Sequence, residues 1–123
     1  MGLPEFDWIR RPDGSSEFED FLDSLPHKDA AKLLAVIDAV ECHGLAVGAR
    51  MEWIKKLEGD LFELRSRTGK NSQRAIYFHE EAGAYIITHG FTKKSRKTPP
   101  GEIRHARQVR AGYWRDRKRG SDS

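Results

Sequence analysis

The sequence is poor in cysteine and in long apolar runs. Its 123 residues include one cysteine, Cys42, which excludes an internal disulfide framework. The longest apolar stretch, residues 33–40, is interrupted by Asp38, so it does not read as a membrane-spanning helix. Glu5 and Asp7 stand where a secretory signal peptide needs an apolar segment. We therefore expect a cytoplasmic protein with no membrane contact, in which Cys42 is a small core residue of a helix.

Nucleotide-binding and metal-binding motifs are also missing. Gly69 and Lys70 resemble the end of a phosphate-binding loop, but Asn71 follows where Ser or Thr is needed, and Leu64 stands in place of the first glycine. The five histidines, at positions 27, 43, 79, 89 and 105, lack the spacing of metal ligands beside acidic residues. The sequence therefore predicts no bound metal and no cofactor.

The charges are distributed unevenly along a globular composition of 37% apolar and 33% charged residues. Residues 1–92 carry 11 basic and 16 acidic side chains, whereas residues 93–119 carry 11 basic and two acidic ones. A basic C-terminal third suggests an anionic partner, although a solvated charged face would give the same pattern. We expect one domain over residues 1–115, followed by a disordered basic and polar tail over residues 116–123.

Two helices are predicted in the first half of the chain. Residues 5–14 predict an edge strand and a turn. Residues 15–25 predict a helix that begins with capping serines and an acidic first turn, which the helix dipole favours. Residues 27–43 have the clearest helical spacing of apolar side chains, and Gly44 is suited to end that helix. We expect the two helices to pack as an antiparallel hairpin with an apolar seam.

An antiparallel meander and a basic helix are predicted in the second half. After Arg50 the apolar period changes to two, which predicts strands in residues 51–60, 61–68, 72–80 and 84–91. Thr98 can then cap a helix whose first residue is Pro99. The predicted fold is α+β: an N-terminal strand, a helical hairpin, an antiparallel β-meander and a C-terminal basic helix.

The turns of the meander set its register. A turn at residues 81–83 predicts that Ile76 lies opposite His89. A turn centred on residue 70 predicts that Arg74 lies opposite Ser66 and diagonal to Arg65. The strand ends therefore determine which charged residues meet.

Four cations are expected at one end of the sheet. Arg65 ends its strand, Arg74 begins the next, and Lys93 and Lys94 follow the third. Like charges held this close repel each other unless solvent, Glu63 or a bound polyanion compensates them. The phosphate diesters of a nucleic acid fit this requirement. The alternative is that the arginines are sheet-surface residues paired with Glu63 and the lysines are solvated.

Two further residues near these cations could carry a proton, His89 and Tyr77. RNA cleavage needs a base for the 2′-OH, positive charge for the developing charge on phosphorus, and an acid for the leaving 5′-oxygen. Lys and Arg can supply that positive charge without a metal. A structural role stays open for both residues, since Tyr77 could simply pack and His89 could be a half-buried histidine.

Three segments resemble a known family. The runs "KKLEGDLFELRSR", "QRAIYF" and "THGFTKKSRKTPPGEIRHARQ" look like the phage-derived, HigB-like branch of the RelE/ParE toxin superfamily. The likeness covers roughly residues 50–112, and the order of the earlier elements also agrees. No single segment is specific, but the succession of all three is.

The resemblance implies the toxin of a type II toxin–antitoxin pair. Such toxins typically cut mRNA in the ribosomal A site. They are silenced by a cognate antitoxin, in this branch usually a small helix-turn-helix protein, through which the complex would bind operator DNA. The resemblance also implies that basic residues at the sheet end contact and activate RNA. Here these are Arg65, Arg74, Lys93 and Lys94. Glu63 corresponds to a position where some members carry an acid–base or cationic group.

Our first hypothesis is therefore a metal-independent, ribosome-dependent mRNA endonuclease that acts through 2′-OH attack. The cations hold the scissile phosphate, and His89, Tyr77 or Glu63 transfers protons. RNA contacts are expected from Lys97, Arg96, Arg104 and Arg107. Two alternatives remain open: a ParE-type inhibitor of DNA gyrase that cuts nothing, and a simple nucleic-acid-binding module.

Overall fold

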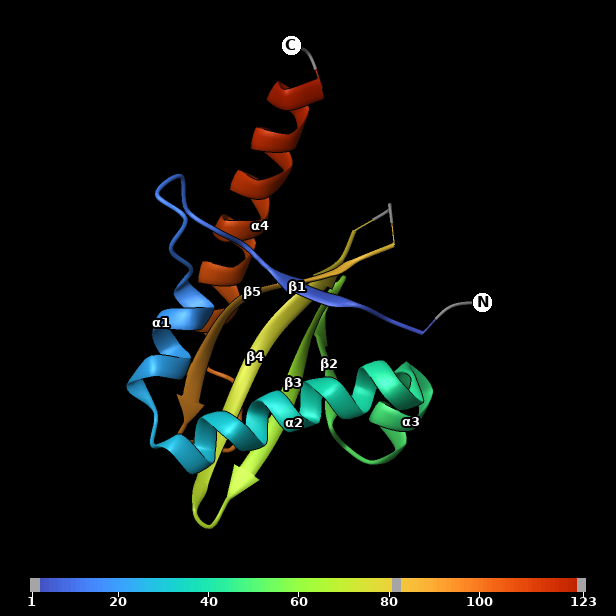
Figure 1. Cartoon of the computed structure of the whole chain (residues 1–123), viewed down its shortest axis with the longest axis vertical. Helices are drawn as coiled ribbons and strands as arrows, with labels where there is room; N and C mark the ends of the chain where they lie inside the picture. The colour runs from blue at the N-terminus through green and yellow to red at the C-terminus, as the bar shows by residue number, and fades with distance from the viewer. Residues whose placement is uncertain (1–2, 81–82, 122–123) are drawn as a thin grey trace.

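A computed structural model describes residues 3–80 and 83–121, which form the predicted α+β arrangement. The chain builds one sheet with helices on both faces (Figure 1). The elements, in chain order, are β1 (Phe6–Trp8), α1 (Glu17–Ser24), α2 (His27–His43), α3 (Leu45–Arg50), β2 (Ile54–Glu58), β3 (Leu61–Thr68), β4 (Asn71–His79), β5 (Tyr85–Lys93) and α4 (Pro100–Ser121).

The five strands lie in the order β1-β5-β4-β3-β2. Strands β2 to β5 form the predicted antiparallel meander. Strand β1 pairs with β5 in parallel, with Phe6 opposite Tyr85, so the sheet is mixed. The prediction that the N-terminal strand lies at an edge is confirmed, and β2 forms the opposite edge.

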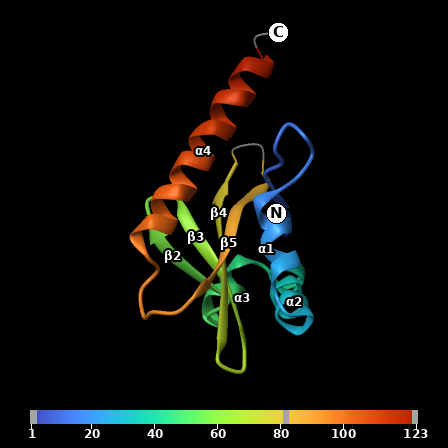
Figure 2. The same ribbon diagram turned by 90° about the vertical axis from the view of Figure 1, so that its left-hand side faces the viewer.

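The sheet lies between α1 and α2 on one side and α4 on the other (Figure 2). It separates two apolar clusters. Helices α1 and α2 cover one face, where Leu64, Tyr77 and Ile87 are buried. Helix α4 covers the other face, where Ile76 and Phe78 are buried. Successive side chains of a strand point to opposite faces, and neighbours such as Ile76 and Tyr77 therefore belong to different clusters.

Helices α1 and α2 begin and end as the sequence predicts. The Ser16 hydroxyl caps α1 by accepting the backbone N–H of Glu19 at 3.3 Å, and Gly44, with φ of +96°, ends α2. Helix α1 packs mainly on β5 and α2 mainly on β3, and the two run in different directions (Figure 1). Their apolar faces therefore meet the sheet rather than a shared seam.

Two features of this region differ from the prediction. Cys42 is exposed and is not a core residue, because α2 turns Leu33, Ile37 and Val40 toward the sheet and leaves position 42 outside. The short helix α3, which the sequence analysis missed, follows α2 directly. A Cβ atom added at Gly48 of α3 would lie 2.8 Å from Cδ1 of Ile54 in β2, so a larger residue there would displace that side chain.

Helix α4 begins at Pro100, one residue later than predicted, and packs on the sheet through Ala106 and Tyr113. It extends beyond the end of the sheet toward the C-terminus (Figure 1). It includes residues 116–121, which the sequence analysis assigns to a tail, while residues 122–123 lie outside the described part. Among the described helices, none has the length and apolar character needed to cross a membrane.

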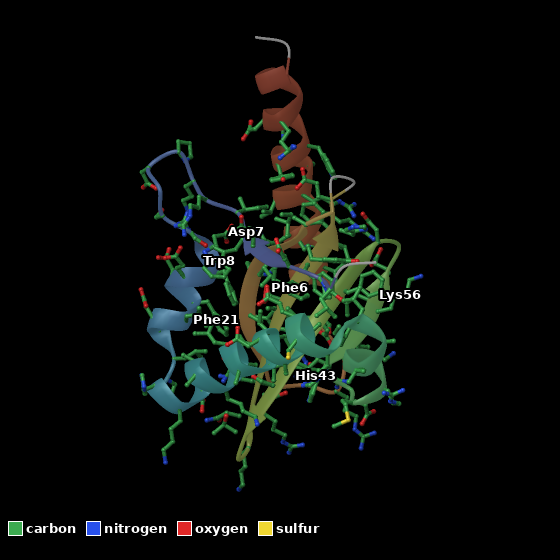
Figure 3. All side chains as sticks on the ribbon, turned by 45° about the vertical axis from the view of Figure 1, so that its right-hand side comes forward. Phe6, Asp7, Trp8, Phe21, His43 and Lys56 are labelled. Carbon is green, nitrogen blue, oxygen red and sulfur yellow. The ribbon has the colours of Figure 1, made fainter. Side chains whose placement is uncertain are left out.

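A close approach between α1 and β5 gives the first testable prediction. A Cβ atom added at Gly90 would overlap the ring of Phe21, whose side chain lies on α1 (Figure 3). Because overpacking forces such a ring out of place, we expect Gly90→Ala to lower the free energy of unfolding by about 1–3 kcal/mol. Urea unfolding followed by circular dichroism measures this loss.

Gly101 provides the matched control. A Cβ atom there meets nothing within 4 Å, and the residue lies in the first turn of α4. Alanine favours a helix over glycine by up to about 1 kcal/mol, so Gly101→Ala should leave the stability unchanged or raise it. Equal behaviour of the two variants would contradict the close contact at Gly90.

Candidate functional site

The β3–β4 turn brings two arginines directly opposite each other. The turn consists of Gly69 and Lys70, and Gly69 has φ of +61°, the left-handed conformation that a two-residue turn favours. The turn is therefore centred between Gly69 and Lys70, and not on residue 70 as predicted. As a result, Arg74 pairs with Arg65, and the predicted pairing with Ser66 is wrong.

The β4–β5 register adds a third cation. The predicted pairing of Ile76 with His89 is confirmed. At the end of β5, Lys93 pairs with Ser72, two residues before Arg74 along β4. The structure therefore brings Arg65, Arg74 and Lys93 together at the end of the sheet that holds the β3–β4 turn.

Glu63 lies at the centre of these cations. Its side chain is fully buried. One carboxylate oxygen, Oε2, is 3.5 Å from Arg74 Nε and 3.8 Å from Arg65 Nε. The other, Oε1, accepts a hydrogen bond of 2.8 Å from the Thr98 hydroxyl. Thr98 therefore ties the segment before α4 to the sheet, whereas the sequence analysis assigned it to capping.

The cluster retains an excess of positive charge. Burial, followed by the nearby Arg65 charge, lowers the pKa of Arg74. Burial and the Arg74 charge likewise lower the pKa of Lys93, although Glu63 opposes the shift. A single carboxylate thus does not neutralise three cations. An anion bound beside them would stabilise their charged forms.

Two adjoining hollows open at this end of the sheet. The larger, which we call the basic hollow, has a volume of about 790 Å³, and every charged side chain that lines it is a cation: Arg67, Lys70, Arg74, Lys93, Lys94 and Arg96. The smaller, the edge pocket, has a volume of about 350 Å³ and is lined by Trp53 and Arg65 among others. The two hollows share Arg67, Ser72 and Arg74, so they form one continuous basic surface.

Three of the predicted RNA contacts lie outside the basic hollow. Lys97 is exposed in the connection to α4. Arg104 is exposed on α4, and Arg107 of the same helix forms an ion pair with Glu58 of β2. These positions can contact a large nucleic acid but do not surround a single phosphate.

His89 lies under α4, away from the opening of the basic hollow. It is 5% exposed, and its Nε2 is 3.4 Å from Glu102 Oε1. Its ring stands at 83° to that of His105, which in turn contacts Glu17 at 2.7 Å. Burial and the His105 charge lower the pKa of His89, while the two glutamates act in the opposite direction. This arrangement fits a structural role better than proton transfer to a substrate.

Tyr77 is not brought to the cations. It is 2% exposed and lies on the face that α1 and α2 cover, packed between Phe6, Phe62 and Tyr85. Burial raises the pKa of its hydroxyl. Its position argues against the proton-transfer role considered for it.

In the described part of the chain, no group of three or more potential metal ligands lies together.

A comparison with known families matches residues 20–111, which include the whole cation cluster, to the family described as phage-derived protein Gp49-like (DUF891). The chain belongs to this family. Two curated relatives are each named "Probable endoribonuclease HigB1", from Mycobacterium tuberculosis strains CDC 1551 / Oshkosh and ATCC 25618 / H37Rv. Each is 31% identical over 94 residues, which is 76% of this chain and 71% of the relative. The phage-derived, HigB-like resemblance is thus confirmed.

Several residues near the site of this Gp49-like protein were not predicted from its sequence. Arg67 and Lys70 line the basic hollow, and the alternation that places Arg65 also places Arg67 on the same face. On the other face, buried Asp29 of α2 accepts hydrogen bonds from Asn71 at 3.0 Å and Gln73 at 3.3 Å. No sequence signal distinguishes Asp29 from an ordinary acidic residue in a first helical turn.

The central carboxylate gives the second prediction. Glu63→Gln keeps the shape of the side chain but leaves Arg74 buried without an anion. Removing one partner of a buried ion pair typically destabilises a protein by about 3–5 kcal/mol, and we expect a loss of that size in urea unfolding. Glu58→Gln is the control, since its ion pair with Arg107 is about half exposed and contributes roughly 0–1 kcal/mol. Similar losses in the two variants would contradict the role of Glu63.

The histidine cluster predicts a pH dependence of stability. Because the pKa of His89 is lower in the folded protein than in the unfolded chain, the folded state binds fewer protons. The stability that neutral His89 contributes is therefore present above its pKa in the unfolded chain, about 6.5, and is lost as the pH falls through its pKa in the folded protein. Between about pH 7.5 and pH 5, the free energy of unfolding should change less for His89→Asn than for wild type. The exposed His43 is the control, and a His43→Asn variant with the same reduced change would contradict the assignment.

Proposed function

We propose that this Gp49-like protein is the toxin of a type II toxin–antitoxin pair, an endoribonuclease that cuts mRNA on the ribosome. The observation that carries the proposal is the cluster of Arg65, Arg74 and Lys93 around buried Glu63, which opens into the basic hollow. The relatives named probable endoribonucleases support the same activity.

The chemistry follows from the charges at the sheet end. Arg74 and Arg65 bind the phosphate diester and stabilise the charge that develops on phosphorus as the 2′-oxygen attacks. The bond to the 5′-oxygen breaks, leaving a 2′,3′-cyclic phosphate and a 5′-hydroxyl. Lys93, whose pKa is lowered by burial and by Arg74, gives up its own proton to solvent more readily than an ordinary lysine, and its neutral amine then accepts the 2′-OH proton. Lys94, in the same hollow, can protonate the leaving oxygen, and this chemistry requires no metal.

Glu63 acts as a positioning residue in this scheme. Its carboxylate fixes both guanidinium groups, and its burial keeps it away from the RNA. The exposed Lys97 and Arg104 are placed to contact ribosomal RNA. A cognate antitoxin, a small helix-turn-helix protein, would silence the toxin by covering the basic hollow with acidic residues and would carry the complex to operator DNA.

Primer extension on a defined mRNA tests the proposal. The purified protein is incubated with the mRNA with and without translating ribosomes. We expect cuts only with ribosomes, at positions in phase with the codons. Cuts in naked RNA would keep the endoribonuclease but remove the ribosome from the proposal. No cut in either reaction would overturn it, and a supercoiling assay would then examine DNA gyrase as the target.

Two double variants show whether the sheet-end lysines are responsible for RNA cleavage. Lys93→Ala with Lys94→Ala should lower the cleavage rate by about 10²–10⁴-fold, because the groups that accept and donate the protons are removed. Lys28→Ala with Lys56→Ala removes the same charge from exposed positions outside both hollows, and Lys56 lies at the β2 edge (Figure 3). Equal rates for the two variants, both folded by circular dichroism, would remove the sheet-end lysines from the mechanism.

A further inference from the structure

The edge pocket has features that phosphate binding does not explain. It lies where β2 begins, since the pairing of β2 with β3 starts with Ile54 opposite Leu64. Beyond Arg65, residues 66–68 of β3 have no pairing with β2. The last backbone contact across this edge is the hydrogen bond of 2.8 Å from Arg65 N–H to the Trp53 carbonyl. The connection from α3 to β2 therefore forms one wall of the pocket.

Trp53 provides an aromatic surface in this wall. Its ring is half-buried and packs in part against the core beneath α2, and the same residue lines the pocket. An indole held in this way offers a π surface at low entropic cost. Stacking on such a surface is how proteins bind unpaired nucleobases.

Glu52, the neighbour of Trp53, lines the pocket in a strained conformation. Its φ is +62°, and it is the one non-glycine residue with positive φ in the described ranges 3–80 and 83–121. It follows α3, at the position after a helix that glycine normally occupies. This conformation ends α3, because it lets the Trp53 N–H donate to the Gly48 carbonyl at 2.8 Å. Glu52 is also the one acidic residue among those that line the pocket, beside Lys32, Arg65 and Arg67, and its carboxylate is an acceptor that phosphate binding does not need.

Ser66 supplies an independent sign of a ligand. It is 5% exposed and lines the pocket, and its hydroxyl has no hydrogen-bond partner among the described residues. A buried hydroxyl without a partner is costly unless something binds to it. Lys32, Arg65 and Arg67 line the same pocket and can contact the phosphates on either side of a bound base.

We propose that the edge pocket binds one unpaired RNA base, stacked on Trp53, and that Glu52 selects guanine. A carboxylate presents two acceptor oxygens. Guanine is the base whose Watson–Crick edge offers two adjacent donors, N1–H and N2–H₂; the other bases place an acceptor beside their donor. Because the pocket shares Arg67 and Arg74 with the basic hollow, the base lies next to the phosphate-binding cluster. This inference rests on the proposed function and specifies its substrate.

Binding of short RNAs tests the pocket without cleavage or ribosomes. Four five-nucleotide RNAs differ only in the central base, whose nucleotide carries a 2′-deoxy sugar so that the bond on its 3′ side cannot be cut. They are titrated at fixed salt while tryptophan fluorescence is recorded. We expect the guanine RNA to bind about tenfold more tightly than the other three, the lower range for a bidentate base contact. We also expect it to quench the fluorescence.

Variants separate stacking from selection. Trp53→Leu keeps an apolar side chain but removes the ring, and it should weaken all four RNAs about tenfold. Glu52→Gln replaces one acceptor by a donor and should abolish the preference for guanine with little effect on the other RNAs. Trp114→Phe and Asp38→Asn change exposed residues outside the pocket and should bind like wild type.

Two results would overturn the inference: equal affinity for the four RNAs, or a guanine preference that survives in Glu52→Gln. Either result leaves the proposed function intact if primer extension still shows cleavage. Conversely, a guanine preference lost in Glu52→Gln supports the pocket even if no cleavage is found, so the two proposals fail separately.

Discussion

The basic site depends on one buried carboxylate, that of Glu63. Two guanidinium groups and a hydroxyl converge on it from β3, β4 and the segment before α4. Arg74 is itself buried and could not remain so without an anion beside it. Yet one carboxylate does not neutralise Arg65, Arg74 and Lys93 together. The same ion pairs therefore fix the local fold and leave a net positive charge facing the basic hollow.

Much of this arrangement could be predicted from the sequence, because strand ends and turn lengths follow local rules. Alternation and the two turns placed Arg74 and Lys93 at one end of the sheet. The same period of two separates Tyr77 from Arg74, since the two residues are an odd number of positions apart, so its face was predictable as well. The contact of Thr98 with Glu63 was not, because it depends on where the chain crosses the sheet after β5.

The position of α4 decides which polar residues of the sheet remain accessible. Helix α4 begins only at Pro100, seven residues after β5 ends at Lys93. His89 lies farther back along β5, where α4 brings Glu102 and His105 against it. The segment between β5 and α4 thus leaves Lys93 and Lys94 at an open surface while the histidine is enclosed. Sequence composition does not distinguish the open environment of Lys93 from the enclosed one of His89, since both residues belong to β5.

The unequal lengths of β2 and β3 give the basic surface its shape. Strand β2 has five residues and β3 has eight, so the end of β3 is an unpaired edge. Such an edge would pair with other strands unless something prevents it. Here Arg65 and Arg67 lie along the edge with Lys32 nearby, and their positive charge disfavours the pairing of a neutral strand with this edge. The same charge and the adjoining Trp53 suit a single-stranded polyanion with exposed bases, so protection of the edge and recognition of RNA follow from the same residues.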